Sequence, residues 1–97
     1  MVSLFENPKD DKFPHVFMMH NNGPRYQSVE LCGTFDNWVT RHKMAFDNYT
    51  NQWFVTLHLA RGKYHYKYVV NNKEWVVNEK ESKDKDPQGN VNNVLNL

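Results

Sequence analysis

The chain has 97 residues, which is enough for one domain with a modest hydrophobic core. Hydrophobic residues make up 39% of it and aromatic residues 14%, a composition typical of a globular protein rather than of a disordered chain. The net charge of +1 and the isoelectric point of about 7.9 differ from the strongly basic character of nucleic-acid-binding domains, so we expect no nucleic-acid partner.

The sequence also shows no sign of a membrane or secretory segment. No apolar run approaches the roughly 20 residues that a membrane span needs, so we expect no membrane partner. The N-terminal stretch MVSLFENPKDDKF has neither a basic end nor an apolar segment, and we expect no signal peptide there. Cys32 is the single cysteine and can form no internal disulfide, which favours a reducing compartment, and we expect a cytoplasmic location.

Along the chain, short apolar segments with a period close to two alternate with polar turns, and no long stretch has a helical period. Residues 1–12 are polar and predict a flexible N-terminal arm, and the charged residues 78–90 predict a loop. The predicted strands, in chain order, are 15–20, 26–33, 42–47, 52–59, 63–70, 75–77 and 91–97. The predicted turns are 20–25, 34–41 around Asp36-Asn37, 48–51, 60–62 and 71–74.

Two consecutive strands, 52–59 and 63–70, carry the clearest alternation. We expect them to form a hairpin in which one row of large side chains from each strand faces the core. Each side chain buried there contributes roughly 1.5–3 kcal/mol to the stability of the fold. On the exposed side of that hairpin, His58 and His65 could pair across the two strands, which is ordinary for an exposed sheet face. Seven or so short strands without intervening helices predict an all-β fold, an antiparallel β-sandwich over residues 13–97. The two rows are Trp53, Val55, Leu57 and Leu59 in the first strand and Tyr64, Tyr66 and Tyr68 in the second.

No arrangement in the sequence is typical of a catalytic or metal site. Cys32 lies in an apolar strand pattern, which favours a small buried side chain over a nucleophile. The five histidines lack the spacing of metal ligands, and the acidic residues of 79–86 are interleaved with lysines as in a solvated loop. Glycine-rich phosphate-binding motifs and G-x-S-x-G are missing. We therefore expect no enzyme activity, no metal site and no cofactor.

Some aromatic residues lie where a core does not require them. Trp38 lies next to the turn residues Asp36-Asn37 and Trp75 follows another predicted turn, while Lys67 lies on the strand face opposite the tyrosines. Asn92 and Asn93 add two carboxamides to the last strand, with Asn93 favoured as structural. A sugar packs its C–H face on a flat indole, and its hydroxyls need donors and acceptors of these kinds. The alternative is that both tryptophans are buried at turns for structural reasons.

Four segments follow one another between residues 29 and 97. The first contains GTFDNW, of the form GxFxxW, and the second is GKYHYKYVVN; a tryptophan follows the next turn, and GNVNN opens the last strand. This order resembles the family 48 carbohydrate-binding modules, which include the glycogen-binding domain of the AMP-activated protein kinase β subunit and the starch-binding module of plant glucan phosphatases. The resemblance implies an immunoglobulin-like β-sandwich that binds α-1,4-glucan without cleaving it.

The resemblance also implies the residues that contact the sugar. Trp38 and Trp75 are similar to two aromatic platforms that stack on successive glucose rings. Lys67 is similar to a lysine, and Asn92 to an asparagine, that hydrogen-bond the sugar hydroxyls. The complete implied set is Trp38, Lys67, Trp75, Gln88, Asn90 and Asn92.

The chain departs from the kinase β subunits at several of these positions. Gln88 stands where they have a leucine that grips the glucan ring, and Asn90 stands where they have a threonine. The turn at 71–74 is about one residue longer than usual, which would shift Trp75, and VVNEKE replaces an acid-histidine-aspartate stretch after it. These departures leave the expected fold unchanged and bear on affinity.

Two functions therefore remain open. The first is a non-catalytic α-1,4-glucan-binding module that holds an attached kinase-regulatory or phosphatase protein at glycogen or starch, with maltooligosaccharides and cyclodextrin as further ligands. The second is a protein–protein interaction module of the same fold that has lost sugar binding and docks on a kinase or phosphatase domain. Exposure of Trp38 and Trp75 on one surface would favour the first function, and burial of either would favour the second.

Overall fold

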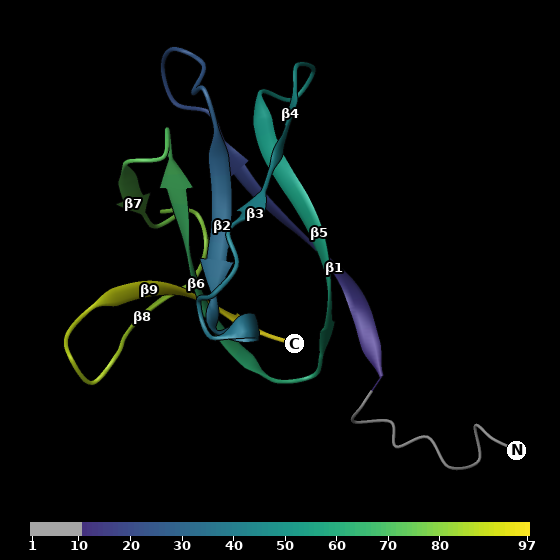
Figure 1. The fold of residues 1–97 in the computed structure, drawn as a ribbon, viewed down its shortest axis with the longest axis vertical. Helices are drawn as coiled ribbons and strands as arrows, with labels where there is room; N and C mark the ends of the chain where they lie inside the picture. The colour runs from purple at the N-terminus through teal and green to yellow at the C-terminus, as the bar shows by residue number, and fades with distance from the viewer. Residues whose placement is uncertain (1–10) are drawn as a thin grey trace, which may run out of the picture.

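Residues 11–97, the part of the chain that this computed structural model describes, form two antiparallel sheets that pack as a β-sandwich (Figure 1). The smaller sheet has the strand order β1-β5-β4, and the larger has the order β3-β2-β6-β9-β8, with β7 also paired to β6. The smaller sheet comprises β1 Lys12–His20, β4 Ala45–Asp47 and β5 Gln52–Ala60. The larger comprises β2 Val29–Gly33, β3 His42–Lys43, β6 Lys63–Val70, β7 Glu74–Val76, β8 Lys83–Lys85 and β9 Val91–Asn96.

The core lies between the two sheets and is rich in aromatic rings. Phe17 of β1 and Trp53 of β5 enter it from the smaller sheet, and Tyr66 and Tyr68 of β6 enter it from the larger. The rings of Phe17 and Tyr66 meet edge to face with their centroids 5.0 Å apart. The predicted all-β sandwich and the inward-facing rows on the two long strands are therefore confirmed.

The predicted hairpin between β5 and β6 is wrong. β5 pairs with β1 and β4, whereas β6 pairs with β2, β7 and β9, so the chain crosses from one sheet to the other at Arg61 and Gly62 (Figure 1). Gly62 has a φ of 157°, which favours glycine, and it exchanges backbone hydrogen bonds with Leu97. The two rows face each other across the core instead of lying side by side. His58 and His65 consequently lie in different sheets and do not pair.

One predicted strand, 42–47, is divided between the sheets. The amide of Met44 donates to the carbonyl of Val29 at 2.9 Å, and the chain bends there. The residues before Met44 form β3 in the larger sheet, and those after it form β4 in the smaller sheet. This division accounts for one of the two strands beyond the predicted seven.

The other additional strand is β8, which lies inside the predicted loop 78–90. Its sequence Lys83-Asp84-Lys85 carries no apolar alternation, and it is held by pairing with β9. At the N-terminal side, β1 begins at Lys12 rather than at residue 15. Residues 1–10 of the predicted flexible arm lie outside the described residues. The described residues contain no helix long and apolar enough to cross a membrane.

A buried asparagine fixes the connection between β1 and β2. The side-chain amide of Asn21 donates to the carbonyls of Gly23 at 3.0 Å and Pro24 at 3.2 Å. Its carbonyl oxygen accepts from the backbone N–H of Tyr26 at 2.9 Å and from the indole N–H of Trp53 at 3.0 Å. One side chain therefore satisfies four groups, including a donor inside the core.

We predict that Asn21→Ala lowers the free energy of unfolding by about 2–3 kcal/mol, because the buried indole N–H and its neighbours lose their partner. Urea unfolding followed by circular dichroism measures this change. The exposed neighbour provides the control, since Asn22→Ala should change stability by less than about 0.5 kcal/mol. Equal effects of the two substitutions would contradict this role of Asn21.

Candidate functional site

A shallow cleft of about 380 Å³ lies on the outer face of the larger sheet. Its side chains come from the loop after β2, from β6, from β7, and from the turn between β8 and β9 together with the start of β9. The lining residues are Trp38, Lys67, Trp75, Asp86, Asn90 and Asn92.

The alternation of β6 places the floor of this cleft. Tyr66 and Tyr68 point into the core, so Lys67 between them points outward. Val69 shares the outer face with Lys67, and it lies directly opposite Trp75 on β7. Residues opposite each other in an antiparallel pair project from the same face, so Trp75 stands beside Lys67 on the outside of the sheet.

The loop after β2 places Trp38. A Cβ at Gly33 would lie 2.7 Å from the carbonyl oxygen of His65, so the absence of a side chain there lets the loop pack closely on β6. The chain then forms a short 3-10 helix, Thr34–Asp36, and the amide of Trp38 donates back to the carbonyl of Gly33 at 2.8 Å. Trp38 has a φ of 63°, a left-handed conformation that bulky residues rarely adopt.

Both tryptophans of the cleft are open to solvent. The exposed fraction is 36% for Trp38 and 48% for Trp75, whereas the third tryptophan, Trp53, is buried in the core. Exposure of two indoles in one cleft is the arrangement that favours a sugar-binding surface over structural burial.

The structure brings five of the six predicted site residues together. Trp38, Lys67, Trp75, Asn90 and Asn92 line one cleft, while Gln88 is exposed and does not line it. Contact of these side chains with a sugar remains a prediction.

Sequence reasoning missed one lining residue, Asp86. Its Oδ1 accepts hydrogen bonds from the backbone amides of Gln88 at 3.0 Å and Asn90 at 2.9 Å, and so organises the turn that presents Asn90. Burial raises the pKa of the Asp86 carboxyl, but hydrogen bonds from Asn90, Gln88 and Asn92 outweigh it and hold the pKa below its ordinary value. The Asp-Pro-Gln-Gly sequence is a turn signal that could have located this residue.

Two neighbours of the cleft have structural roles. Asn93 is buried, donates to the carbonyls of Asn78 at 2.9 Å and Ser82 at 3.2 Å, and accepts from the Asn78 amide at 2.7 Å. His65 lies outside the cleft, with its Nε2 3.7 Å from Asp84 Oδ2. The hydrogen bonds of Asn93 tie the segment before β8 to the sheet that carries the site.

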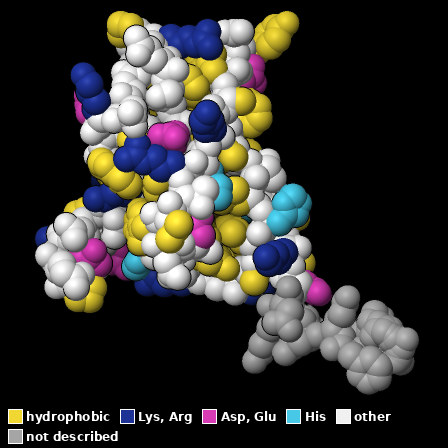
Figure 2. Space-filling model, in the orientation of Figure 1, with side chains coloured by type: hydrophobic (Ala, Val, Ile, Leu, Met, Phe, Trp, Pro, Cys, Tyr) yellow, Lys and Arg dark blue, Asp and Glu magenta, His cyan; other side chains and the backbone are white. Residues whose placement is uncertain are grey.

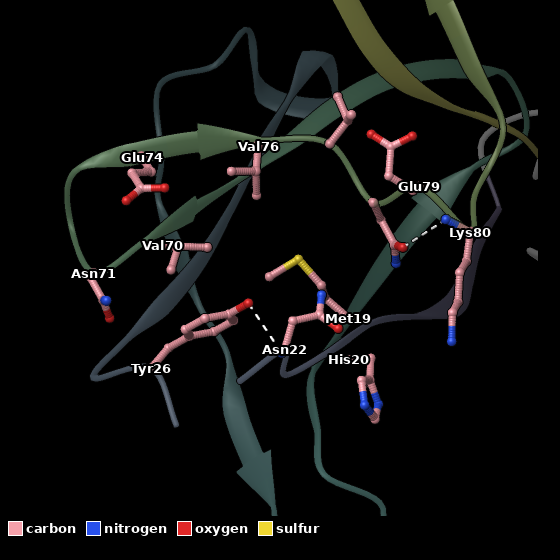
Figure 3. A pocket seen from close by; sticks show the side chains of 12 residues that line it. Met19, His20, Asn22, Tyr26, Val70, Asn71, Glu74, Val76, Glu79 and Lys80 are labelled. Atoms are coloured by element: carbon pink, nitrogen blue, oxygen red, sulfur yellow. Dashed lines mark hydrogen bonds between the residues drawn. The ribbon is translucent and has the colours of Figure 1, made fainter. Parts of the chain in front are cut away.

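A second cavity, of about 420 Å³, opens at an edge of the sandwich. Figure 3 shows Met19, Val70 and Val76 around a shared space, with Glu74 at the rim. The hydroxyl of Tyr26 accepts from the backbone amide of Asn22 at 3.2 Å. Because no tryptophan is among the described residues that line this cavity, they do not supply the paired indoles on which a sugar chain would stack.

The face shown in Figure 2 carries charged side chains of both signs. On the face shown in Figure 2, lysine and arginine side chains are spread over several regions instead of forming one basic patch. Within residues 11–97, no three His, Cys, Asp or Glu side chains form a group that could hold a metal ion.

Comparisons with known proteins bear on the family to which the chain belongs. Residues 13–97 match the family described as the glycogen recognition site of AMP-activated protein kinase. The chain is 36% identical over 77 residues to the amyloplastic phosphoglucan phosphatase DSP4 of Castanea sativa, covering 76% of this chain and 20% of that protein. It is 29% identical over 97 residues to the chloroplastic phosphoglucan phosphatase LSF1 of Arabidopsis thaliana, covering 98% of this chain and 16% of that protein. The chain therefore spans a fifth or less of the length of these relatives.

The depressed pKa of Asp86 predicts an acid-sensitive contribution to stability. A carboxyl with a lowered folded-state pKa stabilises the fold above its unfolded pKa of about 3.9, and this contribution is lost as pH falls through the lower folded value. We expect the difference in Tm between the wild type and Asp86→Asn to be constant above about pH 5 and to shrink below about pH 4. Thermal unfolding between pH 2 and 7 measures it, and a difference that stays constant throughout would contradict the assignment.

Proposed function

This chain belongs to the family of the glycogen recognition site of AMP-activated protein kinase, and we propose that the cleft between Trp38 and Trp75 is its α-1,4-glucan-binding site. The observation that supports this proposal is the exposure of two indoles in one cleft with an ammonium group and two carboxamides. Glycogen, starch, maltooligosaccharides and cyclodextrin share the glucan chain that such a cleft would bind.

Each lining side chain has a part in the proposed binding. The indoles of Trp38 and Trp75 stack on the C–H faces of glucose rings, and Lys67 donates to sugar hydroxyls. Asn90 and Asn92 can both donate and accept. Asp86 offers acceptor oxygens at the edge of the cleft. A hydrogen bond of this kind contributes about 1 kcal/mol net, so we expect micromolar to millimolar affinity, strengthened when several modules bind one polymer.

The carbohydrate-binding modules of this family are non-catalytic, and we propose that this chain likewise performs no chemistry itself. Its role would be to hold an attached protein at glycogen or starch. Both relatives named above are phosphoglucan phosphatases several times longer than this chain, which supports a phosphatase as the attached protein, with a kinase-regulatory protein as the other candidate.

The compartment is a separate part of the proposal. Cys32 is buried with a free thiol, which fits a reducing compartment such as the cytoplasm expected from the sequence. The names of the two relatives instead give plastids. Imaging the full-length protein fused to a fluorescent protein would distinguish the cytoplasm from a plastid.

One observation favours the second function, a protein-interaction module. The outer face of the smaller sheet exposes Val16, Met18 and Phe54, which have exposed fractions of 49%, 38% and 38%. Met18 and Phe54 lie directly opposite each other on β1 and β5. A kinase or phosphatase domain docked there would leave the tryptophan cleft free, so this surface is compatible with glucan binding as well as an alternative to it.

We predict that calorimetric titration detects binding of maltoheptaose and β-cyclodextrin, and that Trp38→Ala and Trp75→Ala each weaken it at least about tenfold, since each removes about 1.4 kcal/mol or more of stacking and apolar burial. Tyr49→Ala is the matched control, because Tyr49 is a fully exposed aromatic residue in the turn between β4 and β5. Circular dichroism verifies the fold of each variant. Absence of wild-type binding at millimolar ligand would reject the glucan site and leave the interaction module.

A further inference from the structure

The loop that carries Trp38 also carries a cation that contacts Trp75. The guanidinium carbon of Arg41 lies 5.6 Å from the centroid of the Trp75 ring, within the range of a cation–π interaction. Arg41 Nη1 donates to Asn72 Oδ1 at 2.6 Å and lies 3.5 Å from Glu30 Oε1. The guanidinium is thus held by a carboxylate, a carboxamide and an indole at once.

The strand register explains how Arg41 reaches Trp75. Glu30 pairs with Lys43 and Leu31 with His42, so the residue before β3 lies beside the end of β2. From there the side chain of Arg41 crosses the outer face of the sheet toward β7. Figure 2 shows hydrophobic surface adjoining Lys or Arg side chains in the region where Figure 1 draws β7.

Arg41 contacts Trp75 without entering the cleft. Among the described residues that line the cleft, Trp75 is present and Arg41 is not. The contact therefore leaves the part of the indole that lines the cleft open to a ligand.

The same arginine is attached to the turn that precedes Trp75. Asn71 and Asn72 both have left-handed backbone conformations, with φ of 54° and 56°. Asn71 Oδ1 accepts from the Gln27 amide at 2.7 Å, and Asn72 Oδ1 accepts from Arg41. The turn is therefore tied to the rest of the sheet at two adjacent residues, which would hold β7 and its tryptophan in place despite the length of the turn.

We propose that Arg41 is a positioning residue that sets the orientation of the Trp75 indole relative to Trp38. It acts through Trp75 and Asn72, and it couples the two platforms because Trp38 and Arg41 belong to one loop. A ring that is fixed before the ligand arrives loses less side-chain freedom on binding, so this support raises affinity. The proposal rests on the proposed function, since it concerns the geometry of the glucan site.

The test uses the full chain labelled with 5-fluorotryptophan, whose three ¹⁹F resonances are assigned with Trp38→Phe and Trp75→Phe. Arg41→Met retains the length of the side chain and removes the guanidinium, and Arg41→Lys retains the charge without the planar fork. Asn72→Gly removes the acceptor while tolerating the left-handed backbone, and it serves as a second route if Arg41→Met fails to fold. Lys43→Met is the control for loss of one positive charge beside Glu30.

We expect Arg41→Met to shift the Trp75 resonance without ligand, to leave the Trp53 resonance in place, and to weaken maltoheptaose binding about fivefold. Arg41→Lys should recover little of this loss, Asn72→Gly should shift Trp75 and weaken binding to a smaller extent, and Lys43→Met should do neither. An unchanged Trp75 resonance, a shift without loss of affinity, or an equal loss in Lys43→Met would overturn the proposal. If the wild type binds no glucan, the proposed function fails, and the ligand-free resonance alone decides whether Arg41 positions Trp75.

Discussion

Tyr66 and Tyr68 fill the space between the two sheets, and the strand that holds them can direct Lys67 only outward. The same alternation directs Val69 to the outer face of the sheet. Trp75 lies directly opposite Val69 on β7 and therefore projects from that face as well. The hydroxyl of Tyr68 donates to Glu81 at 2.8 Å, and burial together with this carboxylate raises the Tyr68 pKa, so the ring remains a neutral core residue. Core and cleft are therefore two faces of β6, and a change in the packing of its tyrosines would move the cleft as well.

The rest of the cleft depends on backbone and polar contacts rather than on the core. Trp38 is held by a left-handed backbone after Gly33, Asn90 by the turn around Asp86, and Trp75 by the Asn71-Asn72 turn that Arg41 contacts. Three separate connections thus meet over one sheet face, each fixed by its own hydrogen bonds. A surface that is formed before the ligand arrives loses little conformational freedom on binding, which suits a module whose individual contacts are weak.

Periodicity identified the strands best where the same residues are both buried in the core and hydrogen-bonded through their backbone to neighbouring strands. The predicted strand 63–70 has the observed bounds, and 52–59 differs by one residue. The pairing of these strands was wrong because alternation is a local signal, while the choice of sheet depends on distant partners such as β1 and β9. β8 was missed because Lys83, Asp84 and Lys85 bury no apolar row. Within the site, resemblance to a family pointed to Trp38, Lys67, Trp75, Asn90 and Asn92, which line the cleft, and to Gln88, which does not. Asp86 emerged from the hydrogen bonds within its own turn, and Arg41 only from contacts between segments far apart in the chain.

The central claim is that glucan occupies the tryptophan cleft and not the cavity between Tyr26 and Val76 at the edge of the sandwich. Titration of ¹⁵N-labelled protein with maltoheptaose, followed by two-dimensional ¹H–¹⁵N NMR, tests it most directly. The account predicts saturable shifts of the indole N–H signals of Trp38 and Trp75 and of the side-chain amide signals of Asn90 and Asn92, with the Trp53 indole signal unmoved. Shifts that instead centre on Tyr26, Asn71 and Val76, with both cleft indoles unperturbed, would contradict it.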